Sequence, residues 1–199
     1  MRAAGPAPSL NLPNALTGLR ILLVPVLGWI LAISRDGRAS LWALAVFVIA
    51  SFTDLIDGKL ARSRGQITAF GELWDPIADK ALTGVAFVSL SVLGELPWWV
   101  TIAIMVREVV ITWMRFTVID AGVVPANRGG KLKTTVQMVA ISMLLIAPAV
   151  GEWRASGTLS VWRLATEVVV DVAVALTLVT GIDYIVSWRR LVSQLPGVR

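Results

Sequence analysis

Residues 54–79 read DLIDGKLARSRGQITAFGELWDPIAD and contain four aspartates at the edges of two apolar segments. Asp54 and Asp57 are three residues apart, so they share one face of a helix. Asp75 and Asp79 are four residues apart and share a face of a second helix. If these two helices are antiparallel neighbours, the four carboxylates converge.

Small residues on the same two faces leave space beside the aspartates. Gly58 and Ala61 continue the face of Asp54, and Gly71 precedes Asp75 by one turn. Because these positions carry almost no side chain, a ligand can approach the backbone closely there.

A group of carboxylates at a membrane edge predicts divalent cations. A carboxylate at the centre of a bilayer costs about 2.5–3.5 kcal/mol, and crowded like charges repel one another. Cations would offset both penalties. All-oxygen ligands suit Mg²⁺ or Mn²⁺, and the chain has no Cys or His that would favour a softer metal.

Structural roles for the same acids remain open at this stage. Asp75 precedes Pro76 and could cap a helix that begins there. Asp54 and Asp57 could form ion pairs with the basic residues that follow them, Lys59, Arg62 or Arg64.

The stretch resembles the pattern D-x-x-D-G-x-x-A-R-(eight residues)-G-x-x-x-D-x-x-x-D of the CDP-alcohol phosphotransferases. The matching residues are Asp54, Asp57, Gly58, Ala61, Arg62, Gly71, Asp75 and Asp79. The resemblance implies two metal ions, Mg²⁺ or Mn²⁺, held by Asp54, Asp57, Asp75 and Asp79. It implies that Asp79 is also the catalytic base. It places the CDP group at Asp57, Gly58, Ala61, Arg62 and Gly71.

A second motif opens the first apolar segment. Residues 11–20, NLPNALTGLR, resemble the N-P-N-x-L-T-x-x-R opening of bacterial phosphatidylglycerophosphate synthases. In the wider family this region helps to hold the cytidine nucleotide, which adds Asn14 and Thr17 to the expected CDP-binding residues. Either residue could also cap the first helix. Arg20 lies about one turn inside and could extend to the near interface.

The composition is that of a membrane protein. The 199 residues are 56% hydrophobic and 16% charged, and their mean hydropathy is +0.77. Several apolar segments are near the length that crosses about 30 Å of hydrocarbon: 15–33, 41–57, 76–93, 97–119, 134–150 and 161–188. We therefore predict an all-α integral membrane protein with six transmembrane helices. Residues 14–190 form its one membrane domain, 1–13 an irregular or interfacial segment, and 191–199 a tail.

The basic residues predict the orientation of these helices. One set of helix ends carries Arg2, Arg20, Lys59, Arg62, Arg64, Arg128, Lys131, Lys133, Arg189, Arg190 and Arg199, whereas the other carries Arg35, Arg38, Arg154 and Arg163. Because positive charge accumulates on the cytoplasmic side, both termini and the loops 58–74 and 120–133 are expected in the cytoplasm. The aspartates then face the cytoplasm. With the family resemblance, this predicts a multi-pass protein of the bacterial cell (inner or plasma) membrane.

The fourth apolar segment carries a polar stripe. Glu108, Thr112 and Arg115 share one face, which Arg107 borders, and in lipid such a face must contact protein or a water-filled cavity. This segment and the later G-K-x-K-T run resemble the phosphatidylglycerophosphate synthase branch of the family. The implied acceptor phosphate-binding residues are Arg107, Arg115, Arg128, Lys131, Lys133 and Thr134.

The two lysines are expected just before the fifth helix, with Thr134 or Thr135 as its N-cap. A helix N-terminus favours a phosphate group. Lys131 and Lys133 could instead mark the cytoplasmic side or contact lipid head groups.

The resemblance implies a transferase that makes phosphatidylglycerophosphate and CMP from CDP-diacylglycerol and sn-glycerol 3-phosphate by metal-assisted in-line attack. It also implies a homodimer in contact with membrane lipid, and no nucleic-acid partner is expected. The same chemistry with inositol phosphate, serine or phosphatidylglycerol as acceptor remains open. An ion transporter is a less favoured alternative, because the acids lie at the membrane edge and no inverted repeat is evident.

Overall fold

The computed structural model describes residues 11–34, 36–64, 68–118, 128–152 and 156–193. They form six helices: α1 (Leu12–Ile33), α2 (Gly37–Arg64), α3 (Ala69–Val92), α4 (Trp98–Val118), α5 (Arg128–Glu152) and α6 (Ser156–Val192). The all-α prediction is therefore confirmed for the described part of the chain.

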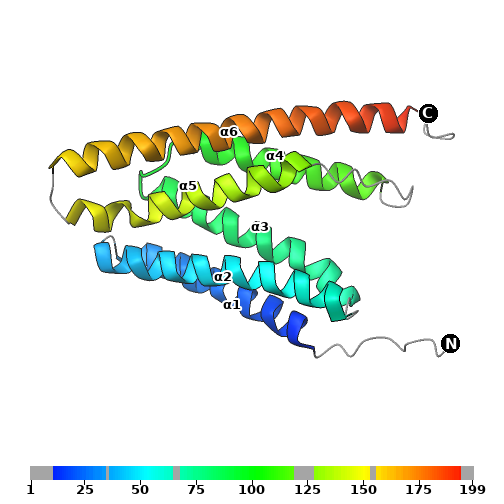
Figure 1. The fold of residues 1–199 in the computed structure, drawn as a ribbon, viewed down its shortest axis with the longest axis horizontal. Helices are drawn as coiled ribbons and strands as arrows, with labels where there is room; N and C mark the ends of the chain where they lie inside the picture. Colours follow the sequence, from blue (N-terminus) through cyan, green and yellow to red (C-terminus); the bar gives the residue numbers. More distant parts are fainter. Residues whose placement is uncertain (1–10, 35, 65–67, 119–127, 153–155, 194–199) are drawn as a thin grey trace.

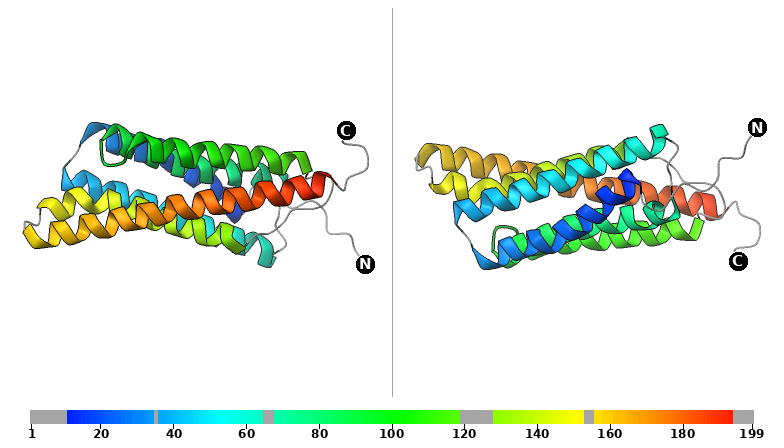
Figure 2. Two further views of the ribbon diagram at one scale, coloured as in Figure 1. Left: turned by 90° about the horizontal axis from the view of Figure 1, so that it is seen from above. Right: turned by 90° about the horizontal axis from the view of Figure 1, so that it is seen from below.

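The six helices pack side by side in a ring. α1 contacts α2 and α3, α2 contacts α5, α5 contacts α6, α6 contacts α4, and α4 contacts α3. All six run along the long direction of the molecule (Figure 2). The start of α1 and the end of α6 lie at the same end of the bundle (Figure 1), which we call the aspartate end because the residues of the 54–79 stretch lie there.

Apolar side chains fill the inside of the ring. Every helix contributes to this core, whose buried members include Leu27, Phe47, Leu82, Phe87, Ile104, Ile141, Leu145 and Val174. Large apolar side chains also cover much of the outside, among them Trp29, Trp42, Val161, Leu164 and Ile182. A bundle that is apolar both inside and outside suits a lipid environment.

Among the described residues, four segments are long and apolar enough to cross a membrane: Leu12–Ile33, Gly37–Asp54, Gly130–Ala149 and Val161–Arg190. They lie in α1, α2, α5 and α6. Charged residues interrupt α3 and α4, including Asp79 and Lys80 in α3 and Arg107 and Glu108 in α4.

The helix boundaries differ from prediction in the motif. α2 continues to Arg64, so much of the predicted 58–74 loop is helical. α3 begins at Ala69, and its N-cap is Thr68, whose hydroxyl oxygen accepts a hydrogen bond from the backbone N–H of Gly71 at 3.1 Å. The prediction that Asp75 caps this helix is therefore wrong. Pro76 lies inside α3, where it removes one backbone hydrogen bond and its ring crowds the carbonyl one turn earlier.

The predicted caps of the first and fifth helices are also wrong. The side chain of Asn11 caps α1 by accepting a hydrogen bond from the backbone N–H of Asn14 at 2.9 Å. α5 begins at Arg128, so Thr134 and Thr135 lie inside it, and their hydroxyls donate to backbone carbonyls one turn earlier. The lysines of the G-K-x-K-T run consequently lie on the helix itself.

Candidate active site

A buried ion pair joins α1 to the first aspartate of the motif. Nη1 of Arg20 lies 2.8 Å from Oδ1 of Asp54; the Arg20 side chain is 0% exposed and that of Asp54 is 30% exposed. The expectation that Arg20 extends to the membrane interface is wrong, because its guanidinium points into the bundle and is held there by the carboxylate. Asp54 thus pairs with a residue far away in the sequence.

A second contact joins α1 to the third aspartate. The hydroxyl of buried Thr17 lies 2.5 Å from Oδ1 of Asp75. The same hydroxyl lies 3.2 Å from the carbonyl oxygen of Pro13, and its single hydrogen can be donated to one of the two oxygens at a time. One face of α1 therefore contacts aspartates from both α2 and α3.

Asn14 and Gly71 meet beside this contact. The hydroxyl of Thr68 donates to Oδ1 of Asn14 at 2.9 Å and accepts from the N–H of Gly71. A Cβ added at Gly71 would lie 3.3 Å from Oδ1 of Asn14 and 3.6 Å from Oδ2 of Asp75. The lack of a side chain at Gly71 thus lets these polar oxygens lie close to the backbone. The structure brings together Asn14, Thr17, Gly71 and Asp75, which the sequence singled out in two separate motifs.

The described aspartates act on one another electrostatically. Asp75 repels Asp54, and Asp54 in turn repels Asp79. Arg20 attracts both Asp54 and Asp79. Among the side chains that the structure describes, no three acids form a group able to hold a metal ion.

Four residues of the motif are placed only by their backbone. Asp57, Gly58, Ala61 and Arg62 lie in the last turns of α2. Their side-chain surroundings fall outside the described part of the structure, and so do those of Arg115 in α4 and Arg128 in α5.

A second polar cluster is centred on Glu108 of α4. Its Oε2 accepts a hydrogen bond from Nζ of Lys80 at 2.7 Å, and its Oε1 accepts hydrogen bonds from Nη1 of Arg107 at 2.9 Å and from Nζ of Lys133. Nη2 of Arg107 also donates to the hydroxyl of Thr180 on α6 at 3.0 Å. We call Glu108, Lys80, Arg107 and Lys133 the Glu108 cluster.

The Glu108 cluster bears on the predicted acceptor site. It unites Arg107 with Lys133, two of the residues predicted to bind the acceptor phosphate. Lys131 is exposed on α5, and the hydroxyl of Thr134 donates to the carbonyl of Gly130. Asp79 interacts electrostatically with both Lys80 and Glu108, so the cluster adjoins the aspartates.

Sequence reasoning missed three residues at these sites: Arg20, Thr68 and Lys80. For Thr68 a signal existed, since a hydroxyl residue immediately before a helical run is a common N-cap. For Arg20 and Lys80 the charge within an apolar segment was visible, but the partner was not.

Comparison with known proteins identifies the family of this chain. The family described as CDP-alcohol phosphatidyltransferase matches residues 10–186. The chain belongs to this family. The matched region extends from the start of α1 into the last turns of α6, so it includes both polar clusters.

Several bacterial members of the family are similar over most of their length. A probable phosphatidylglycerophosphate synthase of Mycobacterium tuberculosis is 45% identical over 98% of this chain and 88% of its own length. A CDP-diacylglycerol–glycerol-3-phosphate 3-phosphatidyltransferase of Rickettsia typhi is 35% identical over 87% of this chain and 94% of its own. The enzyme of that name from Bacillus subtilis is 39% identical over 68% of this chain and 77% of its own.

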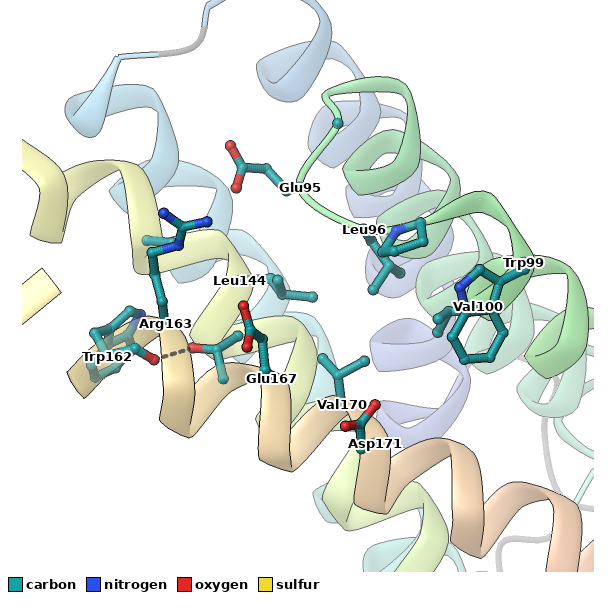
Figure 3. A pocket seen from close by; sticks show the side chains of 14 residues that line it. Glu95, Leu96, Trp99, Val100, Leu144, Trp162, Arg163, Glu167, Val170 and Asp171 are labelled. Atoms are coloured by element: carbon teal, nitrogen blue, oxygen red, sulfur yellow. Dashed lines mark hydrogen bonds between the residues drawn. The ribbon is translucent and has the colours of Figure 1, made fainter. Parts of the chain in front are cut away.

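A pocket of about 420 Å³ lies elsewhere in this family member, between the start of α4 and the facing parts of α5 and α6 (Figure 3). Its lining mixes apolar and charged side chains, among them Trp99, Leu144, Trp162, Arg163, Glu167 and Asp171. Both acids are exposed. The described residues that line it include none of the predicted site residues.

Proposed function

We propose that this protein transfers the phosphatidyl group of CDP-diacylglycerol to sn-glycerol 3-phosphate, which gives phosphatidylglycerophosphate and CMP. The observation that most supports this is the contact of α1 with the aspartate motif, through Thr17 with Asp75 and Arg20 with Asp54. Two motifs that resemble those of the family, 34 or more residues apart in the sequence, thereby form one site. The similar bacterial proteins carry names that state this reaction.

The donor groups fit divalent cations. The candidate ligands offer only carboxylate oxygens, which suit Mg²⁺ or Mn²⁺. The mutual repulsion of Asp54, Asp75 and Asp79 would be relieved by cations. We propose that Asp54, Asp57, Asp75 and Asp79 hold two ions, which when bound would stabilise negative charge on the pyrophosphate and the leaving CMP.

The chain's own residues orient the two substrates. Arg20 and Thr17 fix the carboxylates of Asp54 and Asp75, so that these groups keep one position during the reaction. The CDP group would bind against a surface of small and polar residues from α1, α2 and α3: Asn14, Thr17, Asp57, Gly58, Ala61, Arg62 and Gly71.

Asp79 is the proposed base. It would accept the proton of the acceptor hydroxyl as that oxygen forms a bond to the phosphorus of the phosphatidyl group. The bond from this phosphorus to the oxygen of CMP breaks in line with the attack, and CMP leaves with the bonding electron pair.

The acceptor carries a phosphate group that needs cations. A phosphomonoester has about two negative charges at neutral pH. We propose that it is bound by residues of α4 and α5: Arg107, Arg115, Arg128, Lys131, Lys133 and Thr134. The names of the relatives favour glycerol 3-phosphate over inositol phosphate, serine or phosphatidylglycerol. Membership of a transferase family also disfavours an ion transporter.

The bundle would sit in the bacterial cell membrane as a homodimer, with all six helices spanning and the aspartate end in the cytoplasm. Bacterial relatives support the location. Exposed Arg189 and Arg190 near the end of α6 and exposed Lys131 near the start of α5 support the orientation.

The test is release of CMP from CDP-diacylglycerol by the purified protein in detergent with Mg²⁺, with one candidate acceptor supplied at a time. We expect release that depends on glycerol 3-phosphate and is lost in Asp79→Asn. Asp36→Asn is a suitable control, because Asp36 is exposed at the start of α2, where its side chain caps the backbone N–H of Ala39, and asparagine caps as well as aspartate. Absence of release with every acceptor, from protein shown to be folded, would refute the proposal.

A further inference from the structure

Lys80 is the most open cation of the Glu108 cluster. Its side chain is 33% exposed, compared with 14% for Arg107 and 4% for Lys133. A ligand that reaches this cluster from outside therefore meets Lys80 before the other two cations. Lys80 also follows Asp79 directly in α3, and the two side chains attract each other.

Glu108 fixes the position of the Lys80 ammonium group. Lys133 and Arg107 both bind Oε1 of Glu108, and Lys80 binds Oε2. Arg107 is itself tied to α6 through Thr180. The carboxylate is thus held from two sides. The Glu108 carboxylate accepts a hydrogen bond from one of the three N–H groups of Lys80, and the other two can be donated to a further acceptor.

The net positive charge of the Glu108 cluster favours the binding of another anion. Three cations face one carboxylate in the cluster, and the neighbouring Asp79 offsets part of the remaining positive charge because it attracts Lys80. Partly buried charge that is incompletely compensated is costly, and charge-assisted hydrogen bonds to phosphate oxygens are strong. A phosphomonoester, with about two negative charges, can compensate what remains.

We propose that Lys80 binds the phosphate group of the acceptor and that Glu108 is the positioning residue that holds Lys80 in place. This inference rests on the function proposed above, because it takes the acceptor to be a phosphomonoester. Lys80 would then hold the phosphate end of the acceptor while neighbouring Asp79 faces its hydroxyl. Lys133 and Arg107 would act partly through Glu108.

The experiment is a double-mutant cycle with Lys80→Gln, Glu108→Gln and the combined variant. KM for glycerol 3-phosphate and the inhibition constant of inorganic phosphate are measured by CMP release. We expect each single variant to raise both constants about tenfold or more, with KM for CDP-diacylglycerol little changed. In the combined variant, both constants should rise no further than in the single variant with the larger rise, because both substitutions remove the same contact. Glu167→Gln, an exposed carboxylate of the pocket in Figure 3, is the matched control.

Three results would overturn this inference while the proposed function stands: unchanged constants in Lys80→Gln, additive effects in the combined variant, or an equal rise in KM for CDP-diacylglycerol. If Glu108→Gln does not fold, comparison of Lys80→Gln with Lys80→Arg tests the inference. Only the arginine variant should retain inhibition by inorganic phosphate. Failure of the proposed function is seen separately, as wild-type protein that releases no CMP with glycerol 3-phosphate.

Discussion

Replacing Arg20 by methionine should destabilise the protein substantially. Removal of one partner from a buried ion pair leaves an uncompensated charge and costs about 3–5 kcal/mol. Arg20 is fully buried, but Asp54 is 30% exposed and keeps some hydration. We therefore expect the free energy of unfolding to fall by somewhat less than that range, about 2–4 kcal/mol. Methionine keeps much of the apolar stem of arginine, so the loss reports mainly on the charge.

Thermal unfolding in detergent, followed by tryptophan fluorescence, measures this effect. EDTA should be present, so that bound cations do not contribute to the stability of either protein. For a chain of this size 1 kcal/mol corresponds to about 2–4 °C, so the melting temperature should fall by roughly 5–15 °C. Arg163→Met is the matched control, because Arg163 is exposed on α6, and its effect should stay within about 0.5 kcal/mol.

A second substitution separates the ion pair from simple packing. In Arg20→Met, the further change Asp54→Asn removes the unpaired carboxylate and should restore part of the lost stability. If Arg20→Met has the same melting temperature as the Arg163→Met control, the ion pair makes no measurable contribution to stability, and the reasoning is refuted. If Asp54→Asn instead adds its full cost to that of Arg20→Met, the two residues act independently and the reasoning is refuted.

Further predictions concern the metal ions and three glycines. EDTA should abolish CMP release, and added Mg²⁺ or Mn²⁺ should restore it; activity that persists in EDTA would exclude the proposed ions. Gly71→Ala should raise KM for CDP-diacylglycerol several-fold, because the new Cβ would lie 3.3 Å from Oδ1 of Asn14. A normal KM would contradict the proposed nucleotide site. Gly181→Ala places a Cβ 3.2 Å from Cγ of Arg107, so overpacking of about 1–3 kcal/mol should outweigh the gain of about 1 kcal/mol in helix propensity and lower the melting temperature. Gly18→Ala, where a Cβ meets nothing within 4 Å, should be stabilising in the same assay.

The sequence predicts the helices of this protein well and their ends poorly. The apolar segments show which parts of the chain can lie in lipid. A helix can continue beyond the end of its apolar part. α2 continues through Lys59, Leu60, Ala61 and Arg62 to Arg64, and all four of these residues are good helix formers. The predicted segment ended at Asp57 because the basic residues, from Lys59 onward, begin just after it.

Pairs of residues distant in the sequence could not be predicted at all. Periodicity tells which residues share a face of one helix, and it correctly grouped Gly71, Asp75 and Asp79 on α3. It does not tell which helix lies opposite. The contacts of α1 with Asp54 and Asp75 depend on the ring order of the helices, which a single sequence does not contain.

Charged residues make α3 and α4 poor candidates for membrane spans. The same charged residues connect the two helices to each other. Lys80 of α3 and Glu108 of α4 lie 2.7 Å apart, and Lys133 of α5 and Thr180 of α6 extend the same network to both remaining neighbours. Lys80, Arg107 and Glu108 lower the hydropathy of these two helices, and each of them contacts a polar group of a neighbouring helix. Mean hydropathy counts every residue of a helix, whereas lipid would contact only its outer face. Several charged residues on one helix therefore bring it below the apolar criterion even when they serve a polar site, and in this bundle α3 and α4 supply Asp75, Asp79 and Glu108.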